Sequence, residues 1–134
     1  MSTAEGSILV VDDEETVRRT LTTLLAIENF TVETAGHGGE ALNRLLQGQL
    51  PDVVLMDLMM PTVDGLTALR WIRANPATAA TPVVVLSAKA DPVSRRLAEA
   101  AGADAYVTKP FDVDVLLAVI RSAMVDVGDT LPAS

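Results

Sequence analysis

The feature that most constrains this sequence is a strand-like run followed by a helix-like segment, repeated five times. The runs are short and rich in β-branched residues, and most are apolar throughout, which is typical of strands buried on both faces. They cover 8–11, 31–34, 53–56, 83–86 and 105–108. Strict alternation of strand and helix predicts a parallel sheet with helices on both faces.

The number of units narrows the fold class to a doubly wound α/β domain. A closed barrel needs about eight strand–helix units, so five units exclude it. Five units suit the flavodoxin-like strand order 2-1-3-4-5. The run at 31–34 is weaker and alternates between polar and apolar residues, so we expect it at an edge of the sheet.

Helical spacing and capping residues place the five helices. One buried helical stripe is formed by Val17, Leu21, Leu24 and Leu25. Asp91 followed by Pro92 is a favourable helix start, and Gly102 is a favourable end. The first expected helix contains 17–25 and the second covers 39–47. The third runs from 65 to before 76, the fourth from 92 to 102, and the fifth from a cap at Asp112 to a stop at Gly128.

Composition and charge exclude several classes of function. The net charge of −8 argues against binding to nucleic acid phosphates or to an anionic membrane surface. No apolar run approaches the roughly 20 residues that span a bilayer, and residues 1–7 lack the features of a signal peptide. The chain has no cysteine and one histidine, His37, which excludes disulfides and multi-histidine metal sites. We expect a cytoplasmic location.

Polar side chains follow four of the five expected strands. Asp12 and Asp13 follow the first, Asp57 the third, Ser87 the fourth and Lys109 the fifth. Because the carboxyl ends of parallel strands meet at one edge of a sheet, we expect these groups to lie together. Asp52, in contrast, stands at the opposite end of the third strand and is expected to be structural.

Three carboxylates in one crevice indicate a site for a hard cation. Their mutual repulsion would raise their pKa values unless a cation neutralised them, and Mg²⁺ prefers such oxygen ligands. Lys109 adds a positive charge and Ser87 a hydroxyl donor. A nucleophilic carboxylate, a metal, a cation and an orienting hydroxyl are the parts required for phosphoryl transfer to a carboxylate.

The segments around these positions resemble the receiver domain of response regulators. They read ILVVDDEE at 8–15, PDVVLMDLMMPTVDG at 51–65, PVVVLSA at 82–88 and AYVTKPF at 105–111. The resemblance covers about residues 6 to 127. It implies a division into an N-terminal extension (1–7), a receiver domain (8–127) and a flexible tail or truncated linker (128–134).

The resemblance also implies a role for each residue of the site, a cis peptide bond before Pro110, and Mg²⁺, which Mn²⁺ can replace. The implied roles are the phosphoacceptor Asp57, the acidic metal-binding pair Asp12 and Asp13 with Asp13 as direct ligand, the metal-binding backbone carbonyl of Met59, the phosphate ligands Ser87 and Lys109, and the aromatic switch Tyr106.

The function implied by the resemblance is a phosphorylation-activated switch of two-component signalling. A histidine kinase or histidine phosphotransfer protein would donate the phosphoryl group to Asp57. Ser87 would then move toward the phosphate and Tyr106 would swing inward. This change would bias a partner-binding face made by the fourth helix, fifth strand and fifth helix. The resemblance implies no enzymatic activity beyond self-catalysed phosphotransfer and dephosphorylation, and no direct contact with nucleic acid.

Two other functions stay open from the sequence alone. Asp12, Glu14 and Thr16 form a spacing similar to the nucleophile loop of haloacid-dehalogenase-type phosphatases, with Asp12 as the nucleophile. A flavodoxin-like interaction module that never receives phosphate is the other alternative.

Two local patterns also have more than one interpretation. Asp12 and Glu15 have the spacing of a capping box at a helix start. Val113, Leu117 and Met124 form a second apolar stripe on the last helix, which is either a partner face or the surface of an apolar domain.

Overall fold

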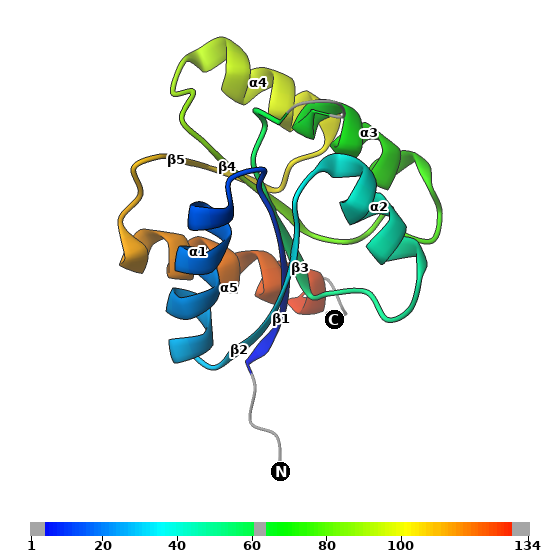
Figure 1. The fold of residues 1–134 in the computed structure, drawn as a ribbon. Helices are drawn as coiled ribbons and strands as arrows, with labels where there is room; N and C mark the ends of the chain where they lie inside the picture. The colour runs from blue at the N-terminus through cyan, green and yellow to red at the C-terminus, as the bar shows by residue number, and fades with distance from the viewer. Residues whose placement is uncertain (1–4, 61–63, 130–134) are drawn as a thin grey trace.

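A computed structural model describes residues 5–60 and 64–129, which build one parallel sheet of five strands (Figure 1). The strand order is β2-β1-β3-β4-β5, as the sequence predicts, with β2 at one edge. The strands are β1 (Gly6–Val11), β2 (Phe30–Ala35), β3 (Val53–Met56), β4 (Val83–Ser87) and β5 (Ala105–Thr108).

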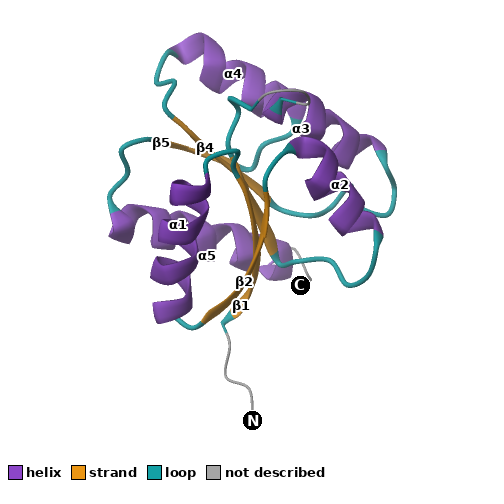
Figure 2. Ribbon diagram, in the orientation of Figure 1, coloured by secondary structure: helices purple, strands orange, loops and turns teal. Residues whose placement is uncertain are grey.

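Helices cover both faces of the sheet (Figure 2). They are α1 (Glu15–Ile27), α2 (Gly38–Leu46), α3 (Gly65–Ala74), α4 (Pro92–Ala101) and α5 (Val113–Asp129). Helices α1 and α5 pack on one face, and α2, α3 and α4 on the other. The doubly wound fold class expected from the sequence is therefore confirmed.

The core divides into two layers because successive residues of a strand point to opposite faces of the sheet. In β1, Ile8 and Val10 pack toward α1 and α5, whereas Leu9 and Val11 pack toward α2 and α3. All four are buried. This two-sided burial explains why the strands read as continuous apolar runs.

The helix caps predicted at Asp91 and Asp112 are present, and Asp64 caps α3 in the same way. These three side chains each accept a hydrogen bond from a backbone N–H group in the following turn, at 2.9, 2.8 and 2.8 Å. Gly102 ends α4 with a φ of 112°, a conformation that favours glycine. These caps fix where the helices begin and end relative to the strands.

Two expected element boundaries differ in the structure. Strand β1 begins at Gly6 instead of residue 8, and the Asp52 N–H group bonds to the Ser7 carbonyl at 2.9 Å. Helix α5 continues through Gly128 to Asp129. A glycine weakens a helix by only about 1 kcal/mol, which does not by itself end it. Residues 1–4 and 130–134 lie outside the described part of the chain.

The capping box that the sequence left open at the start of α1 is not formed. Glu14 occupies the cap position and makes no side-chain capping bond. Asp12 instead accepts a hydrogen bond from the Glu14 N–H group at 2.9 Å, in a turn that precedes the helix. The Asp12 side chain is thereby held at the strand end instead of at the helix.

The second apolar stripe of α5 is not a free surface. Leu117 is buried in the core and Met124 packs against it, so only Val113 of the three is exposed. Both interpretations offered by the sequence are therefore wrong for Leu117.

Within the described residues, no helix has the length and apolar character needed to cross a membrane.

Candidate functional site

The sheet register brings the predicted site residues to one edge. Val11 of β1 pairs with Met56 of β3, so Asp12 and Asp57 follow their strands side by side. The Asp57 N–H group bonds to the Val11 carbonyl at 3.0 Å, which continues the ladder by one residue. On the other side of β3, the Lys109 N–H group bonds to the Ser87 carbonyl at 2.8 Å.

Three carboxylates meet at this edge as predicted. One oxygen from each of Asp12, Asp13 and Asp57 lies within 4.8 Å of the others. Asp12 and Asp57 are buried, at 2% and 6% exposed, whereas Asp13 is exposed. With Lys109 as the nearby cation, the cluster retains two negative charges, so its charge and its oxygen donors fit a divalent cation such as Mg²⁺.

Lys109 bridges the two buried carboxylates. Its Nζ atom lies 3.0 Å from Asp12 Oδ2 and 3.4 Å from Asp57 Oδ2. Partial burial opposes the charge of Lys109, but the hydrogen bond to Asp12 and the charges of Asp57 and Asp12 outweigh it and raise the pKa of Lys109. The ammonium group therefore stays charged and is held above the carboxylates.

Asp57 has a raised pKa. Burial is the largest cause and the nearby Asp12 charge adds to it, while the Met59 N–H group and Lys109 act in the opposite direction. Asp57 Oδ1 accepts the Met59 N–H hydrogen bond at 3.0 Å. The two donors hold this desolvated carboxylate in a fixed orientation.

Ser87 ends the strand beside this cluster, and Tyr106 lies on the neighbouring strand β5. Ser87 is fully buried, and its hydroxyl oxygen accepts a hydrogen bond from the Lys89 N–H group at 3.1 Å. Tyr106 is also buried, and its hydroxyl donates to the Lys89 carbonyl at 2.5 Å. The peptide bond between Lys109 and Pro110 is cis, as the sequence resemblance implies.

Two contributors to the site were missed by the sequence analysis. Arg18, on helix α1, donates a hydrogen bond from its guanidinium group to the Asp12 carbonyl, at 2.7 Å. A Cβ atom on Gly65 would overlap the Asp57 carbonyl oxygen and would lie 2.7 Å from the Cα atom of Leu58. Only a glycine lets α3 approach the loop after Asp57 so closely, and a glycine at a helix start carries no sequence signal of that contact.

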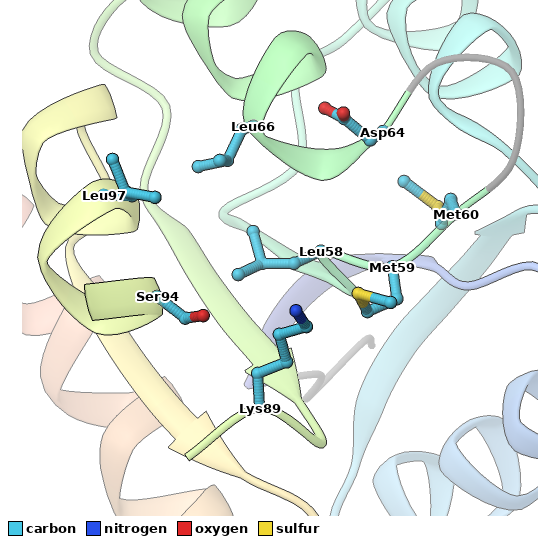
Figure 3. Close-up of a pocket in the computed structure, with 8 residues that line it drawn as sticks. All are labelled: Leu58, Met59, Met60, Asp64, Leu66, Lys89, Ser94 and Leu97. Carbon is cyan, nitrogen blue, oxygen red and sulfur yellow. The ribbon is translucent and has the colours of Figure 1, made fainter. Parts of the chain in front are cut away.

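A cavity of about 530 Å³ lies beside the loop that follows Asp57 (Figure 3). Lys89 reaches into this region toward Leu58 and Met59, and helix α4 borders the other side. The lining is mostly apolar and consists of Leu58, Met59, Met60, Asp64, Leu66, Lys89, Ser94 and Leu97. The first turns of α4 therefore face open space where a core helix would normally face packed side chains.

Comparison with protein families identifies the domain. The sequence profile described as "Response regulator receiver domain" matches residues 8–121. The chain belongs to this family. A receiver domain is a phosphorylation-activated switch of two-component signalling instead of a conventional enzyme, and phosphorylation on aspartate is characteristic of it. Nothing in these comparisons supports a phosphatase or a module that never receives phosphate.

Similar proteins are regulators. Regulatory protein AtoC of Escherichia coli is 42% identical over 122 residues, which are 91% of this chain and 26% of AtoC. Transcriptional regulatory protein ResD of Bacillus subtilis is 42% identical over 109 residues, 81% of this chain and 44% of ResD. Response regulator ArlR of Staphylococcus aureus is 37% identical over 117 residues, 87% and 52% of the two chains. The chain spans about a quarter to a half of these relatives.

Solved structures agree with this assignment. The Vibrio cholerae chemotaxis protein CheY4 superposes with a TM-score of 0.83 at 28% identity, over 90% of this chain and 99% of CheY4. The receiver domain of the Francisella response regulator 1452 gives 0.82 at 30% identity, over 91% and 98%. Receiver domains bind Mg²⁺ in an acidic pocket, and response regulators receive phosphoryl groups from histidine kinases.

Proposed function

We propose that Asp57 is the phosphoacceptor of this receiver domain. The observation that carries the proposal is the position of Asp57, buried at the sheet edge within a cluster of three carboxylates and 3.4 Å from the Lys109 ammonium. Asp13 is too exposed to share this environment. Asp12 is held closer to the Lys109 ammonium, at 3.0 Å, than Asp57 is, at 3.4 Å.

The residues that would hold Mg²⁺ are Asp12, Asp13, Asp57 and the backbone carbonyl of Met59, with Asp13 as the most accessible side chain. The divalent ion, for which Mn²⁺ can substitute, supplies charge neutralisation for the transferring phosphoryl oxygens. The three carboxylates and one ammonium give the site a charge that such an ion balances.

In the transfer step, an Asp57 carboxylate oxygen forms a bond to phosphorus as the bond from phosphorus to the donor nitrogen breaks. The electron pair of the broken bond stays on the imidazole of a histidine kinase or histidine phosphotransfer protein. Lys109 and Ser87 would bind the phosphoryl oxygens, one as a cation and the other as a hydroxyl donor. Lys109 is already fixed between Asp12 and Asp57, so it needs little rearrangement.

The proposed output involves Ser87 and Tyr106. The sequence resemblance implies that Tyr106 swings inward, but Tyr106 is already buried in the structure, at 8% exposed. We propose that Ser87 moves toward the phosphoryl group, that Tyr106 moves into the space that Ser87 vacates, and that this shifts the face made by α4, β5 and α5 toward a downstream protein partner. The structure holds Tyr106 in a buried position linked to the β4–α4 loop. We propose 8–127 as the receiver unit, with a tail or linker after it.

Incubation with Mg²⁺ and acetyl phosphate tests the phosphoacceptor assignment. Intact-mass spectrometry should show the gain of one phosphoryl group in the wild type, lost on omission of Mg²⁺ and on treatment with hydroxylamine. Asp57→Asn should abolish the gain. Asp52→Asn is the matched control, because Asp52 precedes the same strand at its opposite end, and it should be labelled like the wild type. Equal labelling of Asp57→Asn would refute the proposal.

A further inference from the structure

Tyr106 is fixed from three directions. Its ring packs with Leu58, Val85 and Ala98, and the side chain is 8% exposed. Its hydroxyl donates to the Lys89 carbonyl at 2.5 Å. The guanidinium carbon of Arg95, on helix α4, lies 4.8 Å from the centre of the ring. This distance is within the range of about 6 Å over which a cation is attracted to an aromatic face.

The aromatic ring is the partner that the structure gives to the Arg95 side chain. Arg95 is exposed, and acidic residues stand one turn before and after it, at the cap residue Asp91 and at Glu99 of α4. Over residues 5–60 and 64–129, however, Arg95 forms no salt bridge with either of them. The guanidinium group lies over the tyrosine instead.

Helix α4 packs on the sheet through small side chains. The residues that it buries are two alanines, Ala98 and Ala101. Ser94 and Leu97 border the cavity beside the phosphoacceptor loop instead of a packed core (Figure 3). These buried alanines cover little apolar area, and the contact of Arg95 with the aromatic ring adds to the attachment of α4.

A continuous series of contacts joins this pair to the candidate phosphoacceptor site. The Ser87 hydroxyl accepts a hydrogen bond from the Lys89 N–H group, and the Lys89 carbonyl accepts one from the Tyr106 hydroxyl. Arg95 then joins Tyr106 to α4. A change in the position of Ser87 can therefore reach α4 through one residue of the β4–α4 loop and one aromatic side chain.

We propose that Arg95 is a positioning residue that holds Tyr106 in its buried position and so couples helix α4 to Ser87. This rests on the proposed role of Tyr106 as the switch residue. A cation over an aromatic face at an exposed site changes an equilibrium by about two- to fivefold. Loss of the cation should therefore raise the population of outward-facing Tyr106 by that factor.

Fluorine NMR of protein labelled with 3-fluorotyrosine measures this population directly, because Tyr106 is the only tyrosine in the chain. In Arg95→Gln, the resonance should shift toward the frequency of the unfolded protein and should become more accessible to a soluble paramagnetic agent. Arg96→Gln is the matched control, since Arg96 is the exposed neighbour on the same helix, and it should match the wild type. Arg95→Lys, which keeps a cation, should restore most of the wild-type signal.

The measurement needs neither Mg²⁺ nor a phosphodonor, so its failure is distinct from a failure of phosphorylation at Asp57. If Arg95→Gln does not fold, Arg95→Met, which keeps an unbranched stem without the charge, should give the same shift. An unchanged resonance in the folded Arg95 variants, or an equal shift in Arg96→Gln, would overturn the proposal.

Discussion

The amino and carboxyl ends of the sheet both carry aspartates and basic side chains, but these groups are arranged differently. At the amino end, Asp104 accepts hydrogen bonds from Arg73 and from the Val83 N–H group, at 2.9 and 2.8 Å. Asp52 accepts one from the Ser7 N–H group at 2.8 Å. Each of these carboxylates is matched to donors of its own.

At the carboxyl end, three carboxylates crowd together and share one ammonium group, from Lys109. Burial and the neighbouring Asp12 charge raise the pKa of Asp57. The carboxylates at the amino end stabilise the fold and have all their partners within it. The cluster at the carboxyl end has more negative charge than Lys109 balances, which favours binding of a cation.

The largest expected effect is a loss of stability on substitution of Arg73, at the amino end of the sheet. This side chain donates to the carbonyls of Gly102, Ala79 and Thr81 as well as to Asp104. Arg73→Ala should lower the free energy of unfolding by about 2–4 kcal/mol in urea denaturation, because several partners lose their donor.

Exposed Arg70 on the same helix is the control for Arg73. Arg70→Ala should change the free energy of unfolding by less than about 0.5 kcal/mol. Neither variant should slow labelling by acetyl phosphate while the protein is folded. Slower labelling of folded Arg73→Ala would break the separation between the two ends.

The next effect is at the carboxyl end, through Gly65. Gly65→Ala would force a Cβ atom against the Asp57 carbonyl oxygen and the Leu58 backbone. We expect a loss of about 1–3 kcal/mol in stability and about tenfold slower labelling of Asp57, because the nucleophile is displaced. Gly39→Ala is the control, since its Cβ atom would meet only His37, at 3.4 Å. Normal labelling of Gly65→Ala would show that this contact does not position Asp57.

Metal binding should invert the stability contribution of Asp57. In EDTA at neutral pH, Asp57→Asn should be more stable than the wild type, because the raised pKa makes the ionised carboxylate costly in the folded state. This advantage should disappear as the pH falls through the folded-state pKa and wild-type Asp57 takes up its proton.

Mg²⁺ at ten times its dissociation constant should stabilise the wild type by about 1.4 kcal/mol in thermal unfolding. An equal gain in Asp57→Asn would place the metal elsewhere.

The smallest expected effect is on acid stability, through Asp91, the N-cap residue of α4. Hydrogen bonds from the Ser94 N–H and hydroxyl groups lower the pKa of Asp91. Its stabilising contribution is therefore complete above the unfolded-state pKa and is lost as the pH falls through the lower folded-state value. Asp91→Asn should flatten the decline of melting temperature in this acid range, with no change in labelling by acetyl phosphate. An unaltered acid decline would mean that the Asp91 cap does not stabilise the fold.

The sequence predicted the convergence of Asp12, Asp57, Ser87 and Lys109 because parallel strands place their carboxyl ends together whatever the helices do. Contacts that depend on how a helix docks could not be predicted in this way. The approach of Gly65 to Asp57 and the contact of Arg95 with Tyr106 are both of this kind.

Local ambiguity explains the remaining errors. Asp12 and Glu15 have the spacing of a capping box, but the same aspartate can bond to the N–H group two residues later, and the structure has this turn. Gly128 resembles a helix stop, yet nothing in its neighbours decides whether the chain leaves the helix there. In both cases one short pattern is compatible with two backbone conformations.

Chemical mapping of the adduct tests the central claim most directly. Borohydride reduces an aspartyl phosphate to homoserine, so protein treated with Mg²⁺ and acetyl phosphate, then reduced and digested, carries a mark at the acceptor residue. We predict homoserine at position 57 and unmodified aspartate at positions 12, 13 and 52. Homoserine at position 12 or 13 with unmodified Asp57, or no reduction product in protein that has gained a phosphoryl group, would contradict the assignment of Asp57.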